Sequence, residues 1–316
     1  MPERSIAESL VRYGRGRLRR LTFLLLFAAS HLAVLISWRS LAPLGSAFGS
    51  LHYRLAFRAR RRLLRDVAIA LDCSPASARR LLPHAYRTSD RAILEIVALH
   101  SSRLALDDIL ASCSIGGIEQ LARQAASGQG AVLLGMHMGN GVMMAGALAS
   151  QGLPVAVVYR ESRKLPEGYL GEVMQRIGVE PLHVTHANPG SGSRRMLRAL
   201  RQGKLVFVLM DQANKRAEGI PVVFLGKQVY MPEGVVRLAA MAKAPIIPVL
   251  LRSADPHWAY QVNPPVAVSD DPVATVHLLA RLMEDQVREH PEYWTWHQRR
   301  WRLYPFIDGR QAAPSE

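Results

Sequence analysis

The sequence predicts an α/β fold, a layered mixed sheet flanked by helices, with an N-terminal membrane-associated helix. Short apolar runs alternate with helical stretches from about residue 128 onward, and such alternation favours a layered sheet. A basic helical stretch precedes this region, and an uncharged apolar run precedes that stretch. These observations divide the chain into a basic and apolar anchor at 1–57, a helical layer at 58–127, an α/β core at 128–305 and a tail at 306–316.

The composition limits the classes of protein to which the chain can belong. Hydrophobic residues make up 49% of the 316 residues, and the mean hydropathy is +0.04. This is rich for a soluble enzyme and poor for a protein with many membrane spans. Lys and Arg number 40 against 25 Asp and Glu, and the resulting net charge of +15 favours an anionic partner. Cys73 and Cys113 form no CxxC pair, which excludes a zinc or redox motif of that kind.

The apolar run at 21–38 contains no formally charged residue and is barely long enough to span a membrane as a helix. Charge that brackets an apolar stretch fits an anionic membrane surface better than a nucleic-acid groove, so we expect no nucleic-acid partner. A spanning helix, a helix lying in the interface and a buried core helix all remain open. The bracketing arginines are Arg15, Arg17, Arg19 and Arg20 before the run, and Arg54, Arg58, Arg60, Arg61, Arg62 and Arg65 after it.

Helices and strands follow from local patterns. Helices are expected at 58–71, from Ser74 onward and at 89–104, and Ser74 followed by Pro75 is a typical helix start. Apolar runs predict buried strands at 131–136, 154–159, 205–209, 221–224, 246–251 and 258–262. The stretches between them predict helices at 141–151, 170–177, 193–202, 234–242 and 272–290.

A histidine follows the first predicted strand of the core at its carboxyl end. His137 lies in the segment 135–141, where Gly139 and Gly141 allow a tight turn into the next helix. Open α/β sheets place their sites at the carboxyl ends of strands. We therefore expect His137 to act as a general base on a hydroxyl group. Backbone N–H groups at the start of the following helix would help to hold an oxyanion. The alternative is a histidine with a purely structural role.

Three further segments carry polar groups that fit a site. Asp211 and Gln212 directly follow the strand predicted at 205–209, so they face the same edge as His137 if the two strands are parallel. A glycine turn that leads into a helix N-terminus, as in the segment from Gly226 to Gly234 and Arg237, can bind an anion. The segment 291–302, which includes Arg299 and Arg300, interleaves aromatic residues with arginines that can hold a phosphate. The alternatives are an ordinary turn and a packed structural tail.

Together these segments resemble the lipid A biosynthesis acyltransferase family, the lauroyl and myristoyl transferases of the lysophospholipid acyltransferase superfamily. The resemblance covers nearly the whole chain, and its closing segment is the most specific part. The matching segments are 137–140, Asp211-Gln212, 224–226, Pro232, 234–239, 244–249 and 291–301.

The resemblance implies an acyltransferase at the cytoplasmic face of the inner membrane. It implies transfer of a fatty acyl group from an acyl carrier protein or coenzyme A thioester to a hydroxyl of a lipid A-like glycolipid or a related lipid. Membrane lipids and the thioester are then the partners, and neither a metal nor an organic cofactor is expected. His137 corresponds to the base of the family, and Asp211 is the second expected catalytic residue. Expected substrate-binding residues are Gly139, Asn140, Gln212, Gly226, Gly234, Arg237, Arg299 and Arg300.

One position departs from the family. The family pairs its histidine with a carboxylate five residues further on, where this chain has Val142. A carboxylate orients the imidazole and stabilises the imidazolium that forms. We expect Asp211 to supply it from the end of another strand. Without such an acid, the chain would be a weakly active or non-catalytic relative that binds a lipid or a carrier protein.

Overall fold

In the computed structural model of the chain, the structure is described for part of the sequence. The described residues are 24, 25, 27, 28, 31, 32, 35, 37–101, 104–161, 165, 167–185, 189–214, 218–269, 271–297, 301 and 303–307. Half of the apolar run at 21–38 lies outside these residues, as do Arg299 and Arg300. The prediction of an N-terminal membrane-associated helix is therefore untested. Within the described ranges, no helix is both long enough and apolar enough to cross a membrane.

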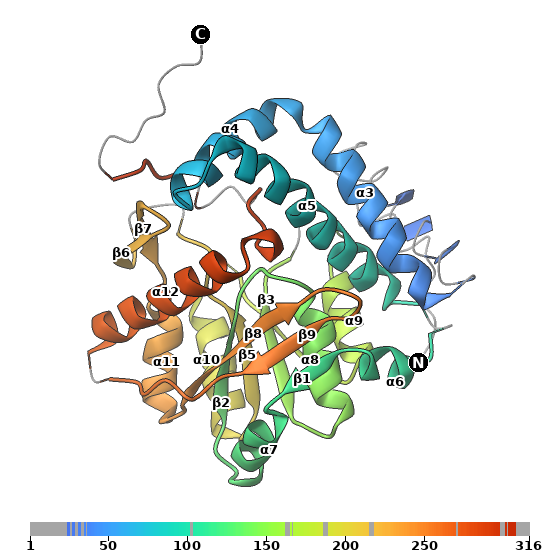
Figure 1. Ribbon diagram of the computed structural model, residues 1–316. Coiled ribbons are helices and arrows are strands. Elements are labelled where there is room, and N and C mark those ends of the chain that lie inside the picture. The colour runs from blue at the N-terminus through green and yellow to red at the C-terminus, as the bar shows by residue number, and fades with distance from the viewer. Residues whose placement is uncertain are drawn as a thin grey trace.

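A seven-stranded mixed sheet forms the centre of the molecule (Figure 1). Its strand order is β1-β9-β8-β2-β5-β3-β4, and every neighbouring pair is parallel except β8 with β9. The predicted layered mixed sheet is confirmed. The strands are β1 (Ser114–Gly116), β2 (Ala131–Gly135), β3 (Val155–Tyr159), β4 (Glu180–His183), β5 (Leu205–Leu209), β8 (Ile246–Ser253) and β9 (Ala259–Val262). Since β1 belongs to the sheet, the sheet begins inside the range that we expected to be a helical layer.

The register of the central strands brings the predicted site together. β2 lies between β8 and β5, and all five of its residues are buried, as its unbroken apolar sequence predicts. Gly135, the last residue of β2, pairs with Leu209, the last residue of β5. His137 and Asp211 thus each lie two residues beyond paired strand ends.

Helices cover both faces of the sheet. Figure 1 shows α10, α11 and α12 on one face and α6, α8 and α9 on the other, with α7 at the end of the sheet opposite α5. Asp271 accepts a hydrogen bond from the N–H of Val273 and so caps α12, which begins with a proline. The helices are α6 (Leu106–Ala111), α7 (Ile118–Ala126), α8 (Gly141–Ser150), α9 (Tyr169–Arg176), α10 (Pro189–Arg201), α11 (Gly234–Ala242) and α12 (Pro272–Glu289).

A layer of three helices, α3 (Leu41–Leu55), α4 (Phe57–Ala70) and α5 (Pro75–Ala98), packs beside the sheet. The expectation of separate helices from Ser74 and at 89–104 is wrong, because α5 runs through both and tolerates a proline inside it. Ser74 caps α5 as predicted, accepting a bond from the N–H of Ser77 at 3.1 Å. A Cβ at Gly45 or at Gly49 would lie 2.5 Å from a backbone Cα of α5. Only glycine allows α3 to approach α5 this closely.

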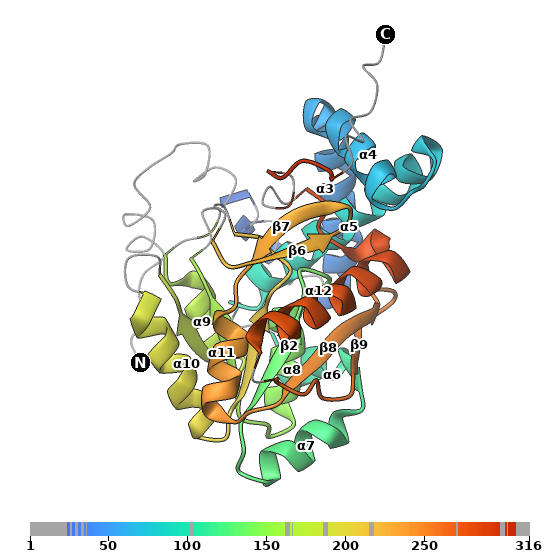
Figure 2. The ribbon, with the colours of Figure 1, turned by 90° about the vertical axis from the view of Figure 1, so that its left-hand side faces the viewer.

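The strand predicted at 221–224 is real but lies outside the main sheet. β6 (Ile220–Phe224) pairs only with β7 (Lys227–Met231), in an antiparallel hairpin. Its residues alternate between buried and exposed, and Val223 is 57% exposed, so the prediction of a buried strand is wrong. Leu225 and Gly226 both have positive φ, as the two central residues of a tight hairpin turn require. In Figure 2 the hairpin lies above α12.

Candidate active site

His137 and Asp211 form the centre of the candidate site. Nδ1 of His137 lies 2.6 Å from Oδ1 of Asp211. The predicted contact between this histidine and a carboxylate from outside its own segment is therefore confirmed. The side chain of His137 is 28% exposed, whereas that of Asp211 is 0% exposed. The pair consequently presents the imidazole to solvent and hides the carboxylate behind it.

Three donors converge on the carboxylate of Asp211. Besides the contact with the imidazole, Oδ2 accepts the backbone N–H of His137 at 3.0 Å and the indole N–H of Trp294 at 2.8 Å. Burial alone would raise the pKa of Asp211, but the attraction of His137 and these hydrogen bonds outweigh it, so the pKa is lowered from its ordinary value. Asp211 is therefore an anion at neutral pH despite its burial.

The contacts of the imidazole specify one tautomer. A carboxylate only accepts hydrogen bonds, so Nδ1 of His137 carries the proton that it donates to Asp211. On the other side of the ring, Nε2 lies 2.9 Å from Nε2 of Gln212. An amide nitrogen only donates, so Nε2 of His137 is the acceptor. This tautomer has its lone pair on Nε2, on the side away from Asp211, as a general base for an external hydroxyl requires.

The segment after α12 fixes the backbone of His137. Thr295 donates both its N–H, at 3.2 Å, and its hydroxyl, at 2.8 Å, to the carbonyl of His137. Trp294, one residue earlier, is 2% exposed and donates to Asp211. Adjacent residues of one segment therefore hold both members of the pair. The sequence suggested a phosphate site or a packed tail here, and for Trp294 and Thr295 the structure supports the packed tail.

Asn140 shapes the turn that follows His137. Its side chain accepts the N–H of Met143 at 3.0 Å and so caps α8. Its amide nitrogen donates to Oε2 of Glu95 at 3.1 Å. Asn140 is 0% exposed, so it faces the interior, and its predicted contact with substrate stays a prediction. Val142, at the position where the family has its acid, packs half-buried against the core.

Glu95 is a buried carboxylate that the sequence analysis missed. Besides Asn140, it accepts the indole N–H of Trp258 at 2.6 Å and Nε of Arg91 at 2.7 Å. Arg91 in turn donates to the carbonyl of Ala254 at 2.6 Å. This network connects α5 to the turn that carries His137. The available signal was an Arg and a Glu four residues apart on the apolar side of a predicted helix.

Replacing Glu95 with glutamine should destabilise the fold strongly. The side chains of Arg91 and Glu95 are 8% and 3% exposed, so the variant leaves a buried guanidinium with only the exposed Asp255, 3.4 Å away, as its carboxylate. Removing one partner of a buried ion pair costs about 3–5 kcal/mol. Urea unfolding of the variant measures this cost. Glu119→Gln on exposed α7 is the matched control and should change the free energy of unfolding by less than about 0.5 kcal/mol. Equal effects of the two variants would contradict the assignment.

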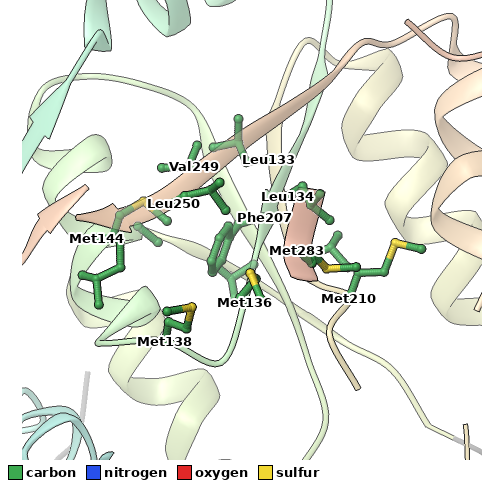
Figure 3. Close-up of a cluster of buried hydrophobic side chains, with 14 of the residues drawn as sticks. Leu133, Leu134, Met136, Met138, Met144, Phe207, Met210, Val249, Leu250 and Met283 are labelled. Atoms are coloured by element: carbon green, nitrogen blue, oxygen red, sulfur yellow. The ribbon is translucent and has the colours of Figure 1, made fainter. Parts of the chain in front are cut away.

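A methionine-rich apolar cluster lies directly under the candidate site. It encloses a cavity of about 10 Å³ lined by Met136, Met138, Gly141, Phe207, Val249, Leu250, Leu251 and Tyr260. A space of this size holds no more than about one water molecule. Figure 3 shows Met138, Met144, Phe207 and Leu250 on one side of β2, and Leu134, Met210 and Met283 on the other. Methionine side chains repack readily, so the cluster can adapt its shape to an apolar group.

The other predicted site residues that the structure describes lie in three places. Gly139 is in the turn after His137, where a Cβ would approach the hydroxyl of Tyr260 to 2.8 Å. Gly226 is an exposed residue in the turn of the β6–β7 hairpin, and Gly234 begins α11. Arg237, on the exposed side of α11, pairs with Glu233 at 3.0 Å. Their contacts with substrate stay predictions, as do those of Arg299 and Arg300, which lie outside the described residues.

The chain is similar to one protein family over most of its length and to individual bacterial enzymes over part of it. Residues 15–303 match the family described as bacterial lipid A biosynthesis acyltransferase. A phosphatidylinositol mannoside acyltransferase of Mycobacterium tuberculosis is 29% identical over 206 residues, which are 63% of this chain and 62% of the relative. A lipid A biosynthesis acyltransferase of Haemophilus influenzae is 25% identical over 184 residues, 57% of this chain and 56% of the relative.

The family match covers more of the chain than the pairwise matches do. The pairwise matches span about three fifths of the length of these curated relatives. The family match covers both central strands, the turn with His137, the Asp211-Gln212 pair and Trp294. The chain belongs to the bacterial lipid A biosynthesis acyltransferase family.

Proposed function

We propose that this protein transfers a fatty acyl group from a thioester to a hydroxyl group of a glycolipid, with His137 as the general base. The observation that carries the proposal is the buried Asp211 carboxylate 2.6 Å from Nδ1 of His137. It supplies the acid that is missing at Val142, and so favours an enzyme over a non-catalytic relative. The names of the relatives, one a lipid A enzyme and one a phosphatidylinositol mannoside enzyme, support a glycolipid acceptor.

The chemistry balances with the groups present. The hydroxyl of the acceptor gives its proton to Nε2 of His137 while its oxygen bonds to the thioester carbonyl carbon, and the carbonyl oxygen becomes an oxyanion. The imidazolium that forms is stabilised by Asp211. When the oxyanion reforms the carbonyl, the C–S bond breaks and the thiolate takes the proton back from His137. No group beyond donor and acceptor is consumed.

The apolar cluster under the site gives the acyl chain a place to bind. Met136 and Met138 flank His137 in sequence and line the cavity beside Phe207. A cavity of about 10 Å³ is too small for an alkyl chain, so binding requires these methionines to move. The thioester would then lie with its carbonyl near His137 and its chain against β5 and β8.

The exposed surface at the junction of α3 and α4 fits the cytoplasmic face of a membrane. Leu55 and Phe57 are 69% and 55% exposed, and Arg58 stacks over the Phe57 ring at 5.6 Å. α4 buries Leu63, Val67 and Ala70 and leaves most of its arginines in solvent. Apolar side chains among arginines favour binding to anionic lipids. An acidic carrier protein would suit the same positive charge.

Binding to vesicles tests the membrane part of the proposal. The full chain should sediment with phosphatidylglycerol vesicles at low salt, and a chain beginning at Leu41 should bind less. The remaining binding should fall as salt rises, because salt screens surface charges beyond about 10 Å at 0.1 M. Arg58→Ser with Arg61→Ser should weaken it further, whereas Arg123→Ser on α7 serves as the control. A full chain that stays soluble with these vesicles at low salt would show that the membrane assignment is wrong.

An acylation assay tests the proposed activity. Purified protein is incubated with palmitoyl-CoA or palmitoyl-carrier protein and, in separate reactions, a lipid A precursor and a phosphatidylinositol mannoside. Mass spectrometry should show a lipid heavier by one acyl group, together with free thiol in equal amount. A protein that acylates neither glycolipid with either donor would contradict the proposed function.

A further inference from the structure

The contact between Gln212 and His137 occupies the position that the acceptor hydroxyl must take. A hydroxyl gives up its proton to a base from a distance of about 2.6–3.2 Å. The amide nitrogen of Gln212 already lies 2.9 Å from Nε2 of His137. An imidazole nitrogen has a single lone pair in the plane of the ring, so it accepts only one donor along that direction. The hydroxyl therefore has to displace this amide before the reaction begins.

We propose that Gln212 is a catalytic residue that holds the place of the acceptor hydroxyl and then donates its amide N–H to the oxyanion. The inference rests on the proposed acyl transfer. Gln212 directly follows Asp211 at the end of β5, so its backbone is fixed beside the base. A carboxamide displaced by one hydroxyl group remains next to that group. That is where the thioester carbonyl must lie for the hydroxyl oxygen to attack its carbon.

Gln212 acts on the negative charge that forms on the carbonyl oxygen of the thioester. As the hydroxyl proton moves to Nε2 and the C–O bond forms, the carbonyl oxygen gains the negative charge. Gln212 donates an N–H to this oxygen and loses no proton itself, so the balance of atoms is unchanged. When the C–S bond breaks and the thiolate takes the proton from His137, the amide can return to Nε2. Glutamine side chains are among the donors that stabilise such oxyanions.

The amide of Gln212 has a different partner in the free enzyme and in the complex with substrate. In the free enzyme, the amide nitrogen of Gln212 occupies the lone pair on Nε2 of His137. In the complex, the hydroxyl has replaced it. Loss of the amide should therefore lower kcat, because the oxyanion loses a donor. KM should not rise, because the acceptor hydroxyl no longer has to displace the amide.

Gln212→Met tests this, because methionine has a similar length and no donor. We expect kcat to fall by about 10²–10³-fold, as for removal of one oxyanion donor, with no rise in KM. Gln120→Met is the control: this half-buried glutamine donates to the carbonyl of Asn263 at 3.1 Å, on α7. Gln212→Ala repeats the test with a smaller side chain, and thermal melting checks that both variants fold. A kcat within about threefold of wild type, or a lower kcat together with a raised KM, would overturn the proposal.

A second readout does not depend on activity. Nuclear magnetic resonance at one fixed pH detects the hydrogen bond itself, through the nitrogen chemical shift of Nε2 of His137 in the wild type and in Gln212→Met. The chemical shift should differ between the two proteins, and identical values would overturn the proposal even in a protein with no transferase activity. Conversely, a difference between the two proteins, when the wild type acylates no lipid, would refute the proposed function and leave the hydrogen bond established.

Discussion

His137→Ala is expected to lower acyl transfer by about 10²–10⁴-fold, the contribution of a positioned general base. The imidazole, bonded to Asp211 at 2.6 Å, provides the nitrogen that accepts the hydroxyl proton. Folding should survive, because the side chain is 28% exposed and Asp211 keeps its bonds to Trp294 and to the N–H of residue 137. Initial rates with a labelled thioester and urea unfolding measure the two effects.

The exposed His257 provides the matched control for this change. His257→Ala should leave the rate of acyl transfer unchanged, so that a loss in His137→Ala cannot come from handling of the protein or from the general loss of a histidine. If His137→Ala kept a rate within about threefold of wild type, His137 would have no part in the mechanism.

Asp211→Asn is expected to reduce acyl transfer by about 10³–10⁴-fold, because it forces the imidazole of His137 into the wrong tautomer. The corresponding change in a Ser-His-Asp triad has a comparable effect. Two fixed donors, the N–H of His137 and the indole of Trp294, point at Oδ2. The oxygen of an asparagine must face them, so its NH₂ group faces Nδ1. Nδ1 then has to accept, and the proton moves to Nε2, where it blocks the base. Initial rates measure the loss.

Stability against pH provides a separate check on the charge of Asp211. Burial raises the pKa of Asp211, but His137 and the hydrogen bonds to the carboxylate outweigh it. The pKa in the folded chain is therefore below the ordinary value of 3.8. The carboxylate therefore contributes stability above about pH 3.8, and this contribution is lost as the pH falls through the lower value of the folded state. The difference in free energy of unfolding between wild type and Asp211→Asn should shrink on acidification over that range. A difference that grows instead would mean that Asp211 is neutral when folded.

Much of the site could be predicted because it depends on strand ends. The apolar runs of β2 and β5 define where each strand stops, and His137 and Asp211 follow at the same spacing. The need to balance a charge on His137 then pointed to Asp211 once Val142 had excluded the local acid. The order of the strands in the sheet could not be predicted in this way. Pairing of β2 with β5 and β8 depends on contacts far apart in the sequence, which periodicity does not report.

The residues that support the pair could not be predicted for a physical reason. A buried carboxylate needs donors, but sequence does not say which indole or backbone N–H reaches it, and Trp294 lies 83 residues from Asp211. Glu95 reads as one more charge on a helix until the packing of α5 on the sheet buries it. The β6–β7 hairpin was missed because its turn, Leu225-Gly226, lacks the Asn or Asp that usually marks such turns.

Mass spectrometry of cellular lipids tests the central claim, that His137 and Asp211 carry out acyl transfer to a glycolipid. Cells lacking the gene are compared with the same cells carrying the wild type, His137→Ala or Asp211→Asn, each checked for equal protein level. We expect the deletion to remove an acylated glycolipid, the wild type to restore it, and both variants to leave the precursor one acyl group lighter. Restoration of that lipid by His137→Ala to the level of the wild type would contradict the account.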